Sequence, residues 1–259
     1  MNGEALPCYS RSMTAQPSLT ALNAEMHSIG AEGCKILIVD NLVPDARPLV
    51  DLAARMGPFP RPEGILYPGL RRYIGERDRE AAAYVAYVCR KLAPLLTEAF
   101  GIGQFRVDNA SFSLATRRPE ETVPYMRIPH YDGVDQKAFA ILHYLSETPQ
   151  GGTAFYRHRR TGFECISPDR AAAFQPGALR DFEDYGEPQG YIGSSTSAFE
   201  RIFDVEGVFN RCLIYSGAML HSGQLAGTAN FSPDPRLGRL TGNIFIRVDR
   251  ADLGPYEAV

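Results

Sequence analysis

Apolar residues follow two different patterns along this chain, and the change between them occurs near residue 104. In the first part, residues 34–39 form a mostly apolar run that predicts a strand. Residues 44–56 and 78–99 carry apolar side chains at the spacing of amphipathic helices, and a glycine follows each segment closely. We therefore expect supporting helices to precede the β-rich part of the chain.

Short apolar runs replace the helical pattern after residue 104. Turn residues, mainly Gly, Pro, Asp and Ser, separate these runs, which is typical of an antiparallel sandwich or barrel. The predicted strands cover 105–107, 111–114, 139–145, 153–156, 199–205, 212–215 and 240–248. One helical pattern, over residues 168–187, interrupts them. The predicted fold class is therefore mainly β with supporting helices, and its core covers about residues 104–249.

The first 33 residues differ from the rest of the chain. They are rich in Ser, Thr, Ala, Gln and Pro and show no sustained period, which predicts a loosely ordered N-terminal arm over residues 1–33. Residues 34–259 contain no internal repeat, and this length is ordinary for one all-β unit. A single domain is predicted for residues 34–259.

Charge and cysteine content exclude several classes of function. The net charge of −3 and the pI of about 6.0 give no basic surface for nucleic acid or anionic membranes. No apolar run is long enough to span a bilayer, and the N-terminus lacks the pattern of a secretory signal. The five cysteines are scattered and predict neither a disulfide framework nor a zinc site. A cytoplasmic protein is expected.

The segment R-I-P-H-Y-D-G carries the strongest chemical signal. His130 and Asp132 are two residues apart, so in an extended segment their side chains point to the same face. His221 follows an apolar strand and a Ser-Gly break, which places a second imidazole near the end of a strand. Two imidazoles and one carboxylate form the facial triad that suits non-haem Fe(II) and leaves coordination positions open.

A candidate anion site lies in the last predicted strand, R-L-T-G-N-I-F-I-R-V. Strand alternation places Arg239, Thr241, Asn243 and Phe245 on one face. A guanidinium with a hydroxyl two residues away suits a small dicarboxylate. Arg236 is a competitor, but its place between Pro and Gly favours a loop.

Five motifs follow one another in a characteristic order: H-Y-D, A-I-L-H-Y-L-S, G-G-T-A-F, L-H-S-G and R-L-T. This order resembles the prolyl-4-hydroxylase-like branch of the Fe(II)/2-oxoglutarate-dependent dioxygenases. The resemblance covers about residues 104–249 and implies a double-stranded β-helix, the cupin-like jelly roll, preceded by N-terminal helices. The chain also resembles an uncharacterised bacterial subgroup of this branch, through Y-P-G and G-G-T-A-F-Y-R-H-R.

The resemblance also implies cofactor-binding residues. Iron would be bound by His130, Asp132 and His221. Arg239 would hold the distal carboxylate of 2-oxoglutarate, and the hydroxyl of Tyr144 would donate to the same carboxylate. A secondary contact to it would come from Thr241. The interval between the last histidine and the arginine is longer than is usual in this family.

The function implied is a hydroxylase-type dioxygenase that uses Fe(II), 2-oxoglutarate and O2. It would hydroxylate an unactivated C–H bond of a small-molecule or amino-acid-like substrate and release succinate and CO2. Asp132 occupies a position that halogenases of this superfamily leave to chloride, so hydroxylation is favoured over halogenation. Two alternatives stay open: a cupin-type metal oxygenase that does not use 2-oxoglutarate, and a non-catalytic jelly-roll binding module. The expected partner is the small-molecule substrate, without nucleic acid or membrane, and a homodimer is left open.

Candidate substrate contacts come from the basic residues near these motifs. Arg127 precedes the metal segment, and Arg157 and His158 belong to Y-R-H-R-R-T-G. The same basic cluster is also typical of a solvated hairpin tip. His143 alternates away from Tyr144 along the strand, so a structural role is predicted for it. The segment 168–198 is a candidate lid over the site.

Overall fold

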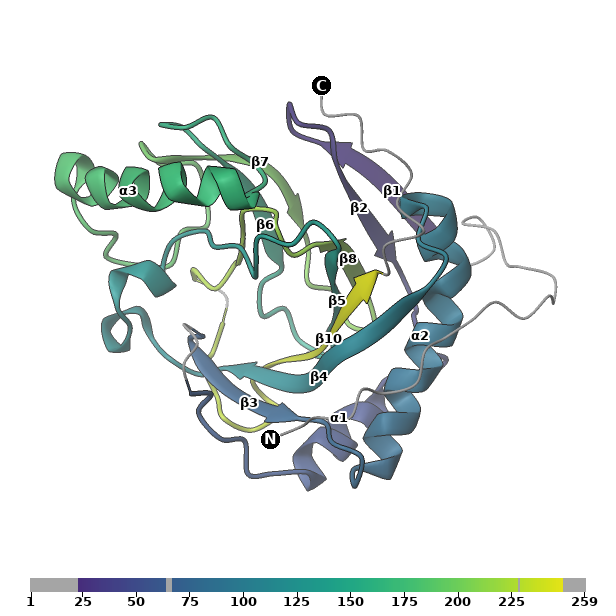
Figure 1. Cartoon of the computed structure of the whole chain (residues 1–259). Helices are drawn as coiled ribbons and strands as arrows, with labels where there is room; N and C mark the ends of the chain where they lie inside the picture. The colour runs from purple at the N-terminus through teal and green to yellow at the C-terminus, as the bar shows by residue number, and fades with distance from the viewer. Residues whose placement is uncertain (1–22, 64–66, 228, 249–259) are drawn as a thin grey trace.

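The computed structural model describes residues 23–63, 67–227 and 229–248, and it contains two antiparallel sheets (Figure 1). The seven-stranded sheet has the order β1-β2-β8-β5-β10-β4-β3 and the three-stranded sheet the order β7-β6-β9. The strands are β1 (Ala24–Ile29), β2 (Cys34–Val39), β3 (Gly69–Tyr73), β4 (Phe105–Ala115), β5 (Ala138–Tyr144), β6 (Thr153–His158), β7 (Phe199–Val205), β8 (Cys212–Ser216), β9 (His221–Gly223) and β10 (Arg239–Val248). The predicted mainly β class is confirmed.

Three α-helices accompany the sheets: α1 (Arg47–Arg55), α2 (Arg79–Phe100) and α3 (Pro168–Tyr185). The first begins later than predicted, because Pro48 rather than Pro44 lies in its first turn. The second ends at Gly101, whose φ of 73° is readily adopted by glycine. Two short 3-10 turns, Pro119–Glu121 and Pro124–Met126, precede the H-Y-D segment. None of the helices in the described residues could cross a membrane.

Apolar side chains form separate layers on both sides of the large sheet. One cluster joins β4, β5 and β10 to α1 and α2, which cover the outer face of the sheet (Figure 1). A second cluster lies between the two sheets, where the ring of Phe155 packs edge-on against Tyr215 at 5.3 Å between centroids. A third joins the small sheet to α3 through Tyr156 and Phe174. The inner faces of the sheets are therefore held opposite one another.

The predicted limits of the arm and the core are corrected by the N-terminal strands. Residues 1–22 of the arm lie outside the described residues, but Ala24–Ile29 forms β1 and pairs with β2 along its whole length. A loosely ordered arm is therefore wrong for this segment. The sequence pattern missed β1 because it is largely exposed and has no continuous apolar run. Three of the seven strands of the large sheet precede residue 104.

His143 has the structural role predicted for it. Its ring is buried on β5 between α2 and the β7–β8 loop, 3.0 Å from the Tyr84 hydroxyl and 3.1 Å from the Asn210 amide oxygen. A neutral imidazole satisfies both contacts, by accepting from the tyrosine and donating to the amide oxygen. Burial lowers the pKa of His143 from 6.5 to about 4.

Stability should therefore decrease in mild acid because of His143. Between pH 7 and pH 4.5 the unfolded chain binds a proton at this residue more readily than the folded chain, which costs about 2 kcal/mol of unfolding free energy. His143→Gln cannot take up that proton. Urea denaturation at both pH values should show a smaller loss for the variant than for the wild type, and equal losses would contradict the assignment.

Candidate metal centre

Possible ligand atoms of His130, Asp132 and His221 lie close together. The Nε2 atom of His221 lies 3.6 Å from a carboxylate oxygen of Asp132, and Nε2 of His130 lies 3.9 Å from the other oxygen. One ligand atom from each residue lies within 4.8 Å of the other two. The structure thus brings together all three residues that the sequence proposed as metal ligands.

Backbone hydrogen bonds fix the segments that carry these side chains. His130 and His221 exchange both main-chain hydrogen bonds, each at 2.8 Å. The amide of Asp132 donates to the carbonyl of Gly217 at 2.7 Å. The H-Y-D segment therefore lies against residues 217–221, and residues 85 to 91 positions apart in sequence become neighbours.

The hydrogen bond of His221 and the lowered pKa of His130 both favour metal binding. Nδ1 of His221 lies 2.8 Å from the carbonyl of Met219, so this nitrogen donates and Nε2 keeps a free lone pair. The side chain of His130 is 52% exposed, toward the cavity that it lines. Desolvation by the surrounding protein, and further His221 and Arg71, lower its pKa to about 4, although Asp132 opposes the shift. Both donors are suited to bind Fe(II) as neutral ligands beside one carboxylate.

A cavity of about 1030 Å³ surrounds these ligands. Its walls come from the inner face of the large sheet, from the loop that carries His130 and from α3. The residues of the predicted lid segment that line it are Phe174, Gln175, Ala178, Leu179 and Tyr191. The volume is at the upper limit of the usual range of sites for drug-sized molecules.

Arg239 lies in the same cavity and is 7% exposed. It donates to the carbonyls of Gly152, at 2.8 Å, and Gly151, at 3.4 Å, and no carboxylate in the described part of the chain pairs with it. Thr241 and Asn243 line the cavity beside it, as strand alternation predicted. A buried guanidinium without a carboxylate partner suits an anionic group of a ligand.

Tyr144 is adjacent to Arg239, although its hydroxyl has a partner within the protein. The arginine lies 5.9 Å from the tyrosine ring centroid, and the hydroxyl donates to Oγ1 of Thr153 at 2.7 Å. Burial raises the pKa of Tyr144 to about 12, so its hydroxyl keeps its proton at neutral pH. Thr153 lines the cavity and belongs to the G-G-T-A-F motif, although no role was predicted for it from the sequence.

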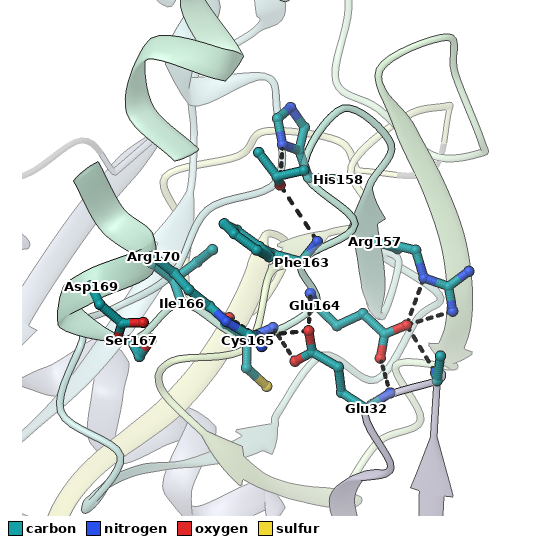
Figure 2. Close-up of polar contacts among 12 residues, drawn as sticks. Glu32, Arg157, His158, Phe163, Glu164, Cys165, Ile166, Ser167, Asp169 and Arg170 are labelled. Atoms are coloured by element: carbon teal, nitrogen blue, oxygen red, sulfur yellow. Dashed lines mark hydrogen bonds and ion pairs between the residues drawn. The ribbon is translucent and has the colours of Figure 1, made fainter. Parts of the chain in front are cut away.

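Of the three predicted substrate contacts, only Arg127 lines the cavity. Its guanidinium is held by Thr122 and by the carbonyl of Pro188. Arg157 instead forms ion pairs with Glu164 and Glu200, as part of the contact network around Glu164 (Figure 2).

His158 is fully buried, and its nitrogens contact Thr161 and Asp181. Neither Arg157 nor His158 lines the cavity, and partners within the protein hold both side chains, so the structure does not bring these two predicted substrate contacts to the site.

Asp181 should be important for the attachment of α3. Its carboxylate, 4% exposed, accepts from His158 at 2.6 Å and from Arg160 at 2.7 Å. Asp181→Ala leaves a buried imidazole without this partner and should lower the unfolding free energy by about 3 kcal/mol in urea denaturation. Asp184→Ala is the matched control on the same helix: its exposed carboxylate pairs with Arg160 alone and should cost less than about 1 kcal/mol. Equal losses would contradict this role.

Four cavity residues on and beside β3 were not predicted from the sequence: Tyr67, Pro68, Arg71 and Tyr73. Arg71 is also close enough to contribute to the lowered pKa of His130. Their segment, Y-P-G-L-R-R-Y, is short and polar, so its pattern gave no strand signal. The Y-P-G motif was the only sequence feature that pointed to this region.

Comparison with known proteins places the chain in a family. A family model described as "Family of unknown function (DUF6445)" matches residues 20–246. The chain belongs to the DUF6445 family. Comparison of this DUF6445 chain with curated protein sequences gives no significant match.

Solved structures share the fold of the DUF6445 chain at low sequence identity. HygX from Streptomyces hygroscopicus, with nickel and 2-oxoglutarate bound, is 13% identical, with a TM-score of 0.50 over 86% of this chain and 91% of HygX. HygX with nickel, 2-oxoglutarate and hygromycin B is 13% identical, with a TM-score of 0.51 over 85% and 84%. The epimerase SnoN, in complex with Fe3+, alpha ketoglutarate and nogalamycin RO, is 14% identical, with a TM-score of 0.50 over 82% and 78%.

Proposed function

We propose that this DUF6445 chain is an Fe(II)- and 2-oxoglutarate-dependent oxygenase that acts on a small molecule. The observation that carries the proposal is one cavity that holds both the His130–Asp132–His221 cluster and the buried Arg239, with which no carboxylate of the described residues pairs. The shared fold adds support, since the HygX and SnoN structures named above contain a metal and 2-oxoglutarate. The longer interval before Arg239 does not prevent its side chain from entering this cavity.

Fe(II) would be held by His130, Asp132 and His221, and when bound it would supply the activation of O2. The reaction converts a substrate C–H bond, 2-oxoglutarate and O2 into the hydroxylated product, succinate and CO2. One oxygen atom enters the product and the other enters succinate. Asp132 also supplies one negative charge beside the metal, and because it is present we propose hydroxylation rather than halogenation.

Arg239 and Tyr144 would bind the distal carboxylate of 2-oxoglutarate. The guanidinium keeps donors available beyond its two carbonyl contacts, and the tyrosine hydroxyl can turn from Thr153 to the entering carboxylate. Thr241, on the same face as the arginine, would be a secondary contact.

Anaerobic titration of the wild-type protein tests the proposal. Fe(II) should bind first, and added 2-oxoglutarate should then produce the visible charge-transfer absorption of a keto acid chelated to Fe(II). On exposure to air, the loaded protein should form succinate from 2-oxoglutarate.

Each of the two other outcomes favours a different function. Iron binding without the absorption band, and without any effect of 2-oxoglutarate on thermal stability, would favour a cupin-type oxygenase that does not use the keto acid. Absence of iron binding would favour a non-catalytic binding module. Either result would contradict the proposed function.

A further inference from the structure

Arg71 lies in a row of residues that crosses the large sheet on its cavity side. Strand pairing places it opposite Ser113, which in turn lies opposite Thr241, and Thr241 lies opposite Tyr144. Directly paired residues of an antiparallel sheet share a face. Arg71 lines the same cavity as Arg239 and Thr241, which are two of the proposed 2-oxoglutarate contacts.

Neutral groups hold the guanidinium of Arg71 in place. Its Nε donates to the hydroxyl of Ser113 at 3.0 Å, and its Cζ lies 4.5 Å from the centroid of the Tyr67 ring. Within the described ranges no carboxylate pairs with Arg71, and its two terminal nitrogens have no hydrogen-bond partner. The side chain is thus oriented while its paired donors stay available, an arrangement that matches the two oxygens of a carboxylate.

The acidic residues of the cavity wall are already engaged elsewhere. Asp108 and Asp135 both pair with Arg247, and Asp132 belongs to the metal cluster. No other Asp or Glu in the described part of the chain lines the cavity. Arg71 therefore has no counter-charge in the wall that it could take up by a side-chain rotation.

The charge of Arg71 has no counter-charge after those of the metal and 2-oxoglutarate are matched, so a substrate could supply one. This step rests on the proposed function. Fe(II) and Arg239 together carry three positive charges. One negative charge of Asp132 and two negative charges of 2-oxoglutarate match them. The charge of Arg71 remains, as does that of Arg127, whose partners are neutral. Once a ligand displaces water from the cavity, an uncompensated charge there is costly unless that ligand brings the opposite charge.

We propose that Arg71 binds a carboxylate group of the substrate, so that this enzyme oxidises a carboxylic acid with an apolar or aromatic body. The apolar or aromatic body of the substrate is inferred from the aromatic rings that line the rest of the cavity, which include Tyr73, Tyr125, Tyr131 and Phe174. Such rings provide apolar contact area around the body of a ligand, while the guanidinium fixes one end.

A pair of probes of the same shape tests the charge requirement. The protein is loaded anaerobically with Fe(II) and 2-oxoglutarate, and 3-phenylpropanoate and its neutral amide are titrated by calorimetry. The wild type should bind the acid at least about tenfold more tightly than the amide. Arg71→Gln should remove this preference, Arg71→Lys should keep part of it, and both should bind 2-oxoglutarate as the wild type does. Arg55→Gln is the control, because its exposed guanidinium pairs with Glu80 outside the cavity.

The outcomes separate this inference from the proposed function. Equal binding of acid and amide by the wild type, or a preference that survives in Arg71→Gln, overturns the role of Arg71. Loss of 2-oxoglutarate binding in Arg71→Gln also overturns it, because the residue would then belong to the co-substrate site. If the wild type fails to bind 2-oxoglutarate but prefers the acid in an Arg71-dependent way, the proposed function fails and the carboxylate site stands.

Discussion

His221→Ala should abolish iron-dependent turnover of 2-oxoglutarate. The substitution removes one of three ligands and, with it, the imidazole that Met219 orients. Loss of an outer partner of a ligand already costs about 10- to 100-fold in metal affinity, so loss of the ligand should weaken Fe(II) binding by more than about 100-fold. Anaerobic Fe(II) titration and succinate formation measure the two effects.

The matched control for this substitution is His27→Ala. His27 is a partly exposed histidine on β1, outside the metal cluster, and it contacts Glu25 and Phe203. Its removal should leave both iron affinity and succinate formation unchanged. If His221→Ala still binds Fe(II) as the wild type does, the three side chains are not the metal site.

Arg239→Ala should separate binding of the co-substrate from binding of the metal. A bidentate contact between a guanidinium and a carboxylate in a buried site contributes about 3 kcal/mol, so the Kd of 2-oxoglutarate should rise by about 100-fold. Fe(II) affinity should stay near the wild-type value because the arginine does not belong to the cluster of metal ligands. The charge-transfer absorption, titrated with 2-oxoglutarate, gives the Kd directly.

Arg236→Ala is the control for this second prediction. Arg236 is close to Arg239 in sequence, but it lies in the loop that was predicted for it and pairs with Asp51 at an exposed position. Its substitution should not change the Kd of 2-oxoglutarate. An unchanged Kd in Arg239→Ala, with normal iron binding, would exclude this arginine as the anchor.

The metal cluster could be predicted from sequence because two of its ligands are fixed by local geometry. His130 and Asp132 are two residues apart, and their backbone hydrogen bonds to residues 217–221 keep the two side chains at the same site. Arg239 and Thr241 likewise follow from alternation along a single strand. In these cases short-range periodicity determines which way a side chain points.

The remaining parts depend on contacts between distant segments. Arg157 and His158 have the residue types of substrate contacts, but Glu164 and Asp181 engage them, and the sequence does not show those pairings. Arg71 was not predicted as a site residue, because the direction of its side chain follows from the pairing of β3 with β4. Strands with little apolar character, such as β1, are likewise defined by their partner strand rather than by their own pattern.

The pairing of β1 with β2 has a consequence for any shortened form of this protein. β2 is apolar and its buried residues include Ile36, Leu37 and Val39. β1 covers one edge of it, and β8 pairs with the other. A chain that begins at residue 34, where the sequence pattern suggests a domain boundary, would expose an unprotected apolar edge strand, which is a template for intermolecular pairing and aggregation.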